Sequence, residues 1–231
     1  MRALVFANGS LQFSQGGNPP FILRPDDIVI AADGGARHCL ALGIQPRFVI
    51  GDLDSLGIEE ASHLRTLGAE IIQHPRRKDY TDLELALRYV QELGVDEILI
   101  LGALGDRWDQ TIANILLPAL LSPGTPGNTV QKTPRITIWD DNQELFFLFG
   151  GDRLEIHGQP GDVVSLIPLS ERTSGVTTNN LEYPLEANDL VLGSTLGISN
   201  VLLGEHGEVS FLEGLMLCVV IHLNDQPSVE E

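Results

Sequence analysis

The stretch that decides the fold of this chain is Arg47-Phe-Val-Ile-Gly-Asp-Leu-Asp-Ser55. Its apolar, β-branched run stops at Gly51, which is typical of a buried parallel strand that leads into a loop. Asp52 and Asp54 follow two residues apart, so in an extended backbone both carboxylates lie on the same side. Two carboxylates about 5 Å apart repel by roughly 3 kcal/mol at an effective dielectric constant near 20. A hard divalent cation such as Mg²⁺ removes this repulsion and commonly carries substrate phosphates as well. The alternative for the Asp pair alone is an Asx-rich turn with two solvated carboxylates.

The composition of the chain limits the classes of protein to which it can belong. Its 231 residues are 43% hydrophobic and 20% charged, which is ordinary for a globular protein of one large or two small domains. The net charge of −18 argues against nucleic acid or an anionic membrane as a main partner. Cys39 and Cys218 form no C-x-x-C motif and favour buried free thiols in a reducing compartment. The sequence shows no signal-peptide layout and no membrane-length apolar run, so we expect a cytoplasmic protein.

Two further predicted strands also end in polar, glycine-containing loops. The strand at 28–31 leads into Asp33-Gly-Gly and a helix, and glycines there would let a phosphate approach the backbone. The strand at 98–101 leads into Gly102-Ala-Leu-Gly-Asp-Arg-Trp-Asp109 and another helix. Neither G-x-G-x-x-G nor a Walker A motif is present, and each loop alone is also compatible with an ordinary turn. Because open α/β sheets bind ligands beyond the carboxyl ends of their strands, we expect these loops to meet at one edge.

A basic run lies within His74-Pro-Arg-Arg-Lys-Asp-Tyr-Thr-Asp-Leu-Glu84. Thr81 and Glu84 form a capping-box pattern, so Asp79 and Asp82 should lie around the N-terminus of a helix. The helix macrodipole alone also favours acidic residues at such a position. The three consecutive basic residues before Asp79 are harder to explain in so acidic a chain, and they predict a clamp for a polyphosphate.

The second half of the chain loses the helical period. From Gly151 onward, short predicted strands are separated by Gly, Pro and Asn turns, which suggests a small β-sandwich or barrel. We therefore predict an α/β domain with a mainly parallel sheet over 1–148 and an all-β sandwich-like domain over 149–231. The stretch 122–134 is predicted to be a loop or linker, and the acidic C-terminal tail is predicted to be mobile.

Five motifs in this order resemble those of the thiamine diphosphokinase (thiamin pyrophosphokinase) family: Asp33-Gly-Gly, Gly51-Asp-Leu-Asp-Ser, Lys78-Asp-Tyr-Thr-Asp-Leu-Glu, Gly105-Asp-Arg-Trp-Asp and Gly197-Ile-Ser-Asn. The resemblance covers nearly the whole chain. It implies that the α/β domain over 1–148 is catalytic and binds ATP and Mg²⁺, and that the β-sandwich over 149–231 binds thiamine and forms a homodimer. It also implies the transfer of a diphosphoryl group from ATP to the hydroxyl of thiamine, which gives thiamine diphosphate and AMP.

The same resemblance implies residue roles. Asp52, Asp54 and Asp79 would position Mg²⁺ and form the catalytic set, and either Asp54 or Asp79 could accept the alcohol proton. Ser199 and Asn200 would line the thiamine site, which would be completed across the dimer interface. With the local patterns above, the expected ATP-binding residues are Asp33, Gly34, Lys78, Thr81, Asp82, Arg107 and Asp109.

Two residues depart from the family pattern. Many bacterial members have Gly-Gly-Arg followed by Asp-His, whereas here Asp106 replaces a glycine and Gln110 the histidine. The loop would therefore hold the phosphates somewhat differently.

The alternative functions are a haloacid-dehalogenase-like phosphatase with Asp52 as nucleophile, a non-catalytic nucleotide-sensing module, and a diphosphokinase for another alcohol such as a hydroxymethyl pterin.

Overall fold

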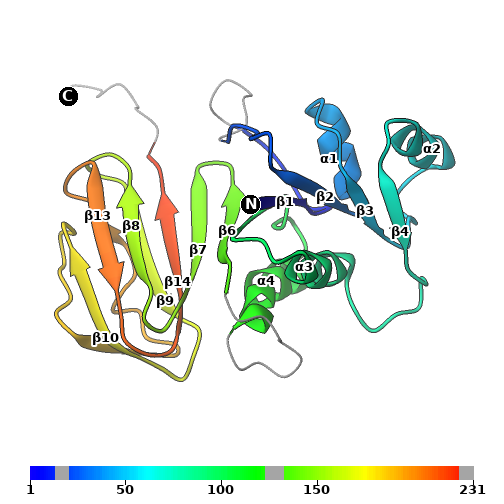
Figure 1. Ribbon diagram of the computed structural model, residues 1–231. Helices are drawn as coiled ribbons and strands as arrows, with labels where there is room; N and C mark the ends of the chain where they lie inside the picture. The colour runs from blue at the N-terminus through cyan, green and yellow to red at the C-terminus, as the bar shows by residue number, and fades with distance from the viewer. Residues whose placement is uncertain (14–20, 123–132, 224–231) are drawn as a thin grey trace. The chain divides into compact units, whose positions relative to one another are not determined.

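The computed structural model describes residues 1–13, 21–122 and 133–223, which form two compact units, Met1–Asp141 and Asn142–Glu231 (Figure 1). The first unit is α/β and the second is all-β, as the sequence predicts. The division falls after Asp141, whereas the sequence pattern predicts it after residue 148. The difference arises because strand β7 (Gln143–Phe149) pairs along its whole length with β14 (Leu215–Ile221) of the second unit. The predicted linker and the acidic tail lie largely outside the described residues.

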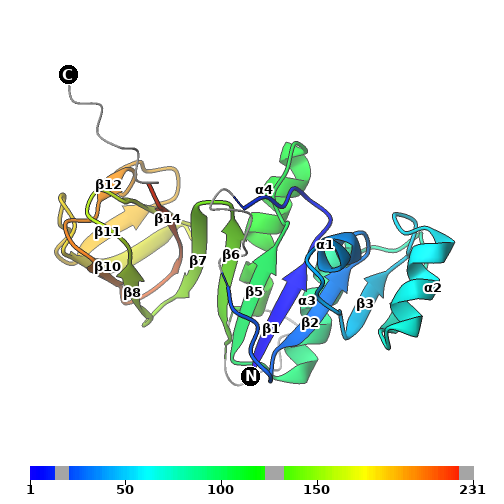
Figure 2. The ribbon, with the colours of Figure 1, turned by 90° about the horizontal axis from the view of Figure 1, so that it is seen from above.

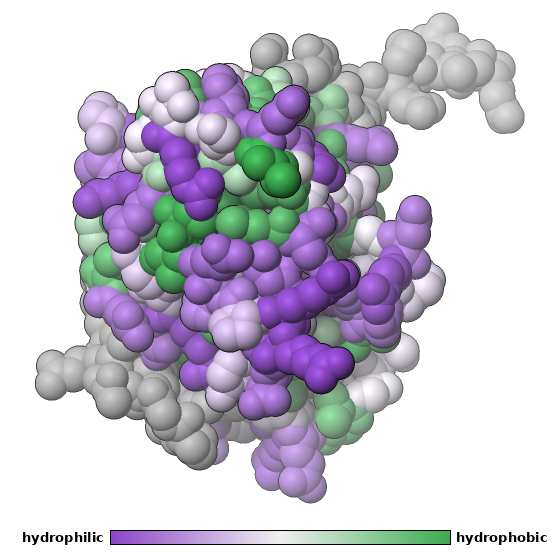
Figure 3. All heavy atoms as spheres, turned by 90° about the vertical axis from the view of Figure 1, so that its right-hand side faces the viewer, coloured by the Kyte–Doolittle hydropathy of each residue, from purple (hydrophilic) through white to green (hydrophobic). Residues whose placement is uncertain are grey.

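The first unit is built on a parallel sheet with the strand order β6-β5-β1-β2-β3-β4. Its strands are β1 (Arg2–Phe6), β2 (Ile28–Ala32), β3 (Phe48–Gly51), β4 (Glu70–Gln73), β5 (Glu97–Leu101) and β6 (Arg135–Asp140). Every residue of β1, β2 and β3 is buried, as expected for strands covered by helices on both faces. The edge strand β4 exposes Glu70 and Gln73, and Figure 3 shows this side of the unit as mostly hydrophilic with a smaller hydrophobic area.

Helices cover both faces of this sheet, with α1 on one side and α3 and α4 on the other (Figure 1). The helices are α1 (Gly35–Ala41), α2 (Ile58–Thr66), α3 (Asp82–Leu93), α4 (Trp108–Leu116) and the 3-10 helix η1 (Leu117–Leu121). Thr81 caps α3, since its Oγ1 accepts the N–H of Glu84 at 3.2 Å. The side chain of Glu84 bonds Arg88 at 2.9 Å, on the next turn of the helix. Asp82 directly follows this cap as the first residue of α3, and it belongs to the site described below.

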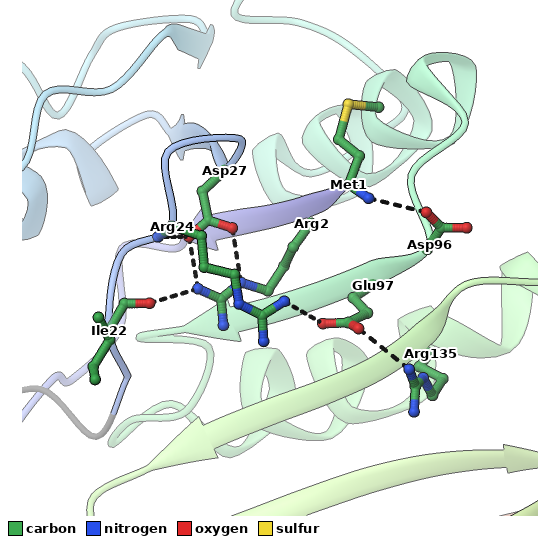
Figure 4. A network of polar contacts seen from close by, with 8 residues as sticks. All are labelled: Met1, Arg2, Ile22, Arg24, Asp27, Asp96, Glu97 and Arg135. Atoms are coloured by element: carbon green, nitrogen blue, oxygen red, sulfur yellow. Dashed lines mark hydrogen bonds and ion pairs between the residues drawn. The ribbon is translucent and has the colours of Figure 1, made fainter.

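A network of ion pairs holds the amino ends of the strands, at the edge opposite the predicted site (Figure 4). Arg2 at the start of β1 bonds Asp27 at 2.6 Å, and the two side chains are only 11% and 1% exposed. Burial favours a raised pKa for Asp27, but the hydrogen bonds from Arg2 and Arg24 prevail and lower it. Glu97 at the start of β5 binds Arg24 and Arg135, each at 3.2 Å. These ion pairs connect the amino ends of the strands, whereas the polar loops lie at the carboxyl ends.

The second unit contains two antiparallel sheets, ordered β12-β9-β14-β7 and β11-β10-β13-β8, which enclose a common core (Figure 2). Its other strands are β8 (Arg153–His157), β9 (Val163–Pro168), β10 (Arg172–Asn179), β11 (Asn188–Val191), β12 (Asn200–Val201) and β13 (His206–Ser210). Cys218 lies in this core and Cys39 in the first unit, and both are free and buried. Burial raises the pKa of each thiol to about 12, so both are protonated packing residues. Within the described residues, none of the helices has the length and apolar character needed to cross a bilayer.

Candidate active site

Three carboxylates meet where β2, β3 and α3 converge at the carboxyl edge of the parallel sheet. Asp33, Asp52 and Asp82 each offer an oxygen atom, and these atoms all lie within 4.8 Å of one another. Gly51 allows this approach, because a Cβ at that position would stand 2.8 Å from Asp82 Oδ1 and 2.9 Å from Asp33 Cβ. Any other residue at position 51 would therefore push the carboxylate cluster apart.

Lys78 supplies the positive charge next to this cluster. Its Nζ lies 2.5 Å from Asp82 Oδ1 and 3.5 Å from Asp52 Oδ2, and its side chain is 13% exposed. Burial alone would lower the pKa of Lys78, but the two carboxylates outweigh it and raise the pKa, so the ammonium is retained. Burial raises the pKa of Asp82 in spite of Lys78, whereas the backbone N–H of Asp54 lowers the pKa of Asp52.

Asp33 is held in a conformation that few residues other than glycine adopt. Its φ is +44°, its N–H donates to the carbonyl of Ile50 at 2.9 Å, and the residue is only 4% exposed. Among the described residues, Asp33 Oδ1 is a buried side-chain oxygen without a hydrogen-bond partner. A buried carboxylate oxygen that lacks a partner is costly, and a bound cation would remove that cost. The oxygen-only donor set fits a hard divalent ion such as Mg²⁺.

Asp54 and Asp79 lie outside this carboxylate cluster. Leu53 adopts a left-handed φ of +64°, so the backbone is not extended between Asp52 and Asp54. Asp54 forms an ion pair with Arg76, with 3.1 Å between Oδ2 and Nη2. Asp79 is exposed and precedes Thr81, the N-cap of α3. The metal-ligand roles of Asp54 and Asp79 therefore stay predictions, while Asp33 and Asp82 join Asp52 in the cluster.

The loop after β5 is held by two side chains of α4. Thr111 Oγ1 accepts the N–H of Gly105 at 3.1 Å, and Asn114 Nδ2 donates to the carbonyl of Ala103 at 2.7 Å. At the exposed end of the loop, Arg107 and Asp109 pair with each other at 2.6 Å. Both of these predicted ATP-binding side chains thus face solvent, where a ligand could rearrange them.

Asn8 is a site residue that the sequence analysis missed. A Cβ on Gly34 would stand 2.2 Å from Asn8 Oδ1, so the amide lies directly against the Asp33-Gly34 turn. Asn8 Nδ2 also donates to Ser55 Oγ at 3.3 Å, which links the loop after β1 to the loop after β3. Its position was a usable signal, because Asn8 is the first polar residue after the apolar run Ala3-Leu-Val-Phe-Ala7.

In the second unit, Ser199 and Asn200 differ in their surroundings. Ser199 is exposed, has a φ of +58°, and donates its N–H to Ser165 Oγ at 3.0 Å. Asn200 is 5% exposed, and its amide bonds both the N–H and the carbonyl of Tyr183, at 2.9 and 2.6 Å. The amide of Asn200 is thus engaged in holding the loop, whereas Ser199 is free to meet a ligand from solvent.

The fold and this site define a class: an α/β protein with a cluster of three carboxylates beside a lysine, suited to phosphates and a hard divalent cation. Comparison with known proteins narrows this class. Family models described as "Thiamin pyrophosphokinase, catalytic domain" and "Thiamin pyrophosphokinase, vitamin B1 binding domain" match residues 22–122 and 153–216. Thiamine pyrophosphokinase of Bacillus subtilis is 31% identical over 190 residues, which are 82% of this chain and 85% of that protein. The chain belongs to the thiamine pyrophosphokinase family.

Other relatives and solved structures agree with this assignment. Thiamine pyrophosphokinase 1 of Arabidopsis thaliana is 27% identical over 227 residues, covering 87% of this chain and 79% of that protein. The crystal structure of the Bacillus subtilis thiamine pyrophosphokinase superposes with a TM-score of 0.80, at 27% identity, over 96% of this chain and 99% of that one. The structure from Geobacillus thermodenitrificans gives a TM-score of 0.78 at 26% identity, over 97% and 99% of the two chains.

Proposed function

We propose that this chain transfers a diphosphoryl group from ATP to the hydroxyl of thiamine, giving thiamine diphosphate and AMP in a Mg²⁺-dependent reaction. The observation that carries the proposal is the cluster of Asp33, Asp52 and Asp82 beside Lys78, because it combines hard oxygen ligands with a fixed cation. The names of the relatives favour thiamine over a pterin or another alcohol as the acceptor.

Within this proposal, Asp33, Asp52 and Asp82 would hold Mg²⁺, and Asp54 and Asp79 are further candidate ligands from the family resemblance. When bound, the ion neutralises phosphate charge and polarises phosphoryl oxygens. The unpartnered Asp33 Oδ1 is the atom with most to gain from such a ligand.

The basic side chains of the first unit would position the polyphosphate. ATP brings about four negative charges to a chain whose own net charge is −18, so binding needs local positive charge. Lys78 lies inside the site, Arg76 pairs with Asp54, and the side chains of Arg76 and Arg107 are 78% and 69% exposed. The Asp33-Gly34 turn and Thr81 would complete the ATP site. Transfer then depends on positioning and charge neutralisation, with Asp54 or Asp79 as acceptor of the alcohol proton.

The second unit would bind thiamine and form a homodimer with shared active sites. The family model for a vitamin B1 binding domain that matches 153–216 supports the first part. Ser199 is the better of the two predicted contacts because its hydroxyl is not buried. The use of ATP and the two buried free thiols lead us to propose a cytoplasmic location.

A screen of acceptors tests this function. The protein is incubated with ATP and Mg²⁺ and with thiamine, a hydroxymethyl pterin or no acceptor, and AMP is measured. We expect AMP to form at an appreciable rate only with thiamine. Release of inorganic phosphate without any acceptor would instead indicate a phosphatase, and AMP formed only with the pterin would reassign the acceptor.

A further inference from the structure

The second unit carries a group of metal-ligating side chains that the proposed reaction does not use. Glu155 and His157 lie on β8, and His206 is the first residue of β13. Each offers one ligand atom, these atoms lie within 4.8 Å of one another, and all three residues are exposed. We call these three residues the histidine cluster.

Strand pairing places the histidine cluster on one face of its sheet. His206 is the direct cross-strand partner of His157 in the antiparallel pair of β13 and β8. Glu155 lies two residues before His157 and so points to the same face, while Ile156 between them is 1% exposed in the core. The backbone ladder, rather than a loop, therefore sets the spacing of the three side chains.

The distance between the two imidazoles suits a shared ligand. His157 Nδ1 and His206 Nδ1 are 2.9 Å apart, and the rings stand at 86° to each other. Two nitrogen ligands bound at about 2.0–2.1 Å to one ion lie roughly 2.8–3.0 Å apart at a bond angle of about 90° and roughly 3.3–3.4 Å apart at the tetrahedral angle of about 109°. The imidazole nitrogens would therefore move apart by about 0.4–0.5 Å around a tetrahedral ion. Without an ion, one of these nitrogens has to donate a hydrogen bond to the other.

Two glutamates lie on this face, and they differ in their partners: Glu208 is in an ion pair, whereas Glu155 has only a weak contact. Glu208, opposite Glu155, forms an ion pair with Arg153. Glu155 Oε1 lies 3.9 Å from His206 Nδ1, beyond hydrogen-bond distance, so its contact with the imidazole is weak. Glu155 is thus the carboxylate that could join the two histidines at an ion.

We propose that Glu155, His157 and His206 form a binding site for a divalent transition-metal ion such as Zn²⁺. Imidazole nitrogens favour Zn²⁺ over Mg²⁺, so this site differs in preference from the oxygen-only cluster of the first unit. Three protein ligands leave a fourth position for water, as in open zinc sites. The ion would tie the end of β8 to the start of β13, and its binding does not depend on the proposed reaction.

Zinc titration of the untagged, chelator-treated protein tests the site, with excess Mg²⁺ present to occupy the oxygen-only cluster. Isothermal calorimetry should show one Zn²⁺ per chain for the wild type. His157→Gln and His206→Gln should each weaken this binding at least about tenfold, and Glu155→Gln should weaken it measurably. His63→Gln, which removes an exposed histidine from α2, is the matched control and should bind like the wild type.

Thermal unfolding gives a second readout. Zn²⁺ should raise the melting temperature of the wild type and of His63→Gln, but not that of His157→Gln or His206→Gln. Circular dichroism without metal confirms that the variants fold. If the wild type binds no Zn²⁺, or if all variants bind it equally, the proposal is overturned and the two histidines form only a hydrogen-bonded pair.

Discussion

At the scale of single residues, Gly51 controls how closely the three carboxylates approach. In Gly51→Ala the new Cβ would meet Asp82 and Asp33 within 2.9 Å, so the cluster has to open. We expect ATP turnover to fall about tenfold or more, equivalent to about 1.4 kcal/mol of lost transition-state stabilisation. Gly43→Ala is the matched control, because Gly43 has a φ of +66° with nothing within 4 Å of its Cβ position. This control should cost about 1 kcal/mol of stability and leave turnover unchanged; equal turnover in both variants would remove Gly51 from the site account.

Substitutions of Ser199 and Asn200 should have different effects, because Ser199 is a candidate ligand contact whereas Asn200 supports a loop. Asn200→Ala removes both bonds to the backbone of Tyr183, so it should lower the free energy of unfolding by about 1–3 kcal/mol. Ser199→Ala changes an exposed hydroxyl and should leave stability unchanged while raising the KM for thiamine about tenfold. Denaturant unfolding and thiamine titrations on both variants measure the two effects. A stable Asn200→Ala protein with a raised KM would return Asn200 to the role of a direct contact.

The sequence predicts most residues of the site, but it does not predict which of their side chains come together. The sequence identified Asp33, Asp52, Lys78 and Asp82 as members of strand-exit loops or helix starts, and these do meet. It could not reveal the left-handed φ of Leu53, which departs from the extended backbone expected between Asp52 and Asp54, because no residue type there demands that conformation.

At the scale of elements, the end of β14 is tied to β7 and to the loop before β9 by His222. Its Nε2 lies 2.8 Å from Glu144 Oε1, and its Nδ1 lies 3.0 Å from Asp162 Oδ2. The hydrogen bond to Glu144 is the main cause that raises the pKa of His222 above its ordinary 6.5, with Asp162 adding to it against burial. The imidazolium therefore stabilises the fold fully below about pH 6.5, and this contribution is lost as the pH rises through the raised pKa.

The consequence for stability can be measured with His222→Gln. The melting temperature of the wild type should exceed that of the variant by more at pH 5.5 than at pH 8.5. Far below that range the trend reverses, because the pKa of Asp162 is lowered and its contribution disappears on protonation. A difference that stays constant from pH 5.5 to 8.5 would show that the charge on His222 does not contribute.

Element types followed well from the sequence where pattern and burial agree. The apolar runs of β1, β2, β3 and β5 predict buried parallel strands, and all four are central strands of the sheet. Pro118 predicts the end of a helix, and α4 does end at Leu116 and passes into η1. The short strand β12 was missed, since two residues within a Gly- and Ser-containing loop carry no readable period.

At the scale of the whole molecule, the second unit exposes several large apolar side chains. Tyr183, Leu192, Leu196 and Leu212 are between 61% and 72% exposed. Together with the family resemblance, this leads us to predict a homodimer through the second unit. Light scattering at working concentration should give twice the chain mass of 25.1 kDa, and a monomer mass would argue against shared active sites.

The most direct test of the proposed reaction follows the phosphorus atoms. The protein is supplied with thiamine, Mg²⁺ and ATP labelled at the β-phosphorus, and the products are separated. If the chain transfers a diphosphoryl group in one step, the label appears in thiamine diphosphate, and AMP forms in equal amount without label. Label that remains in ADP, with thiamine monophosphate as the product, would contradict the account.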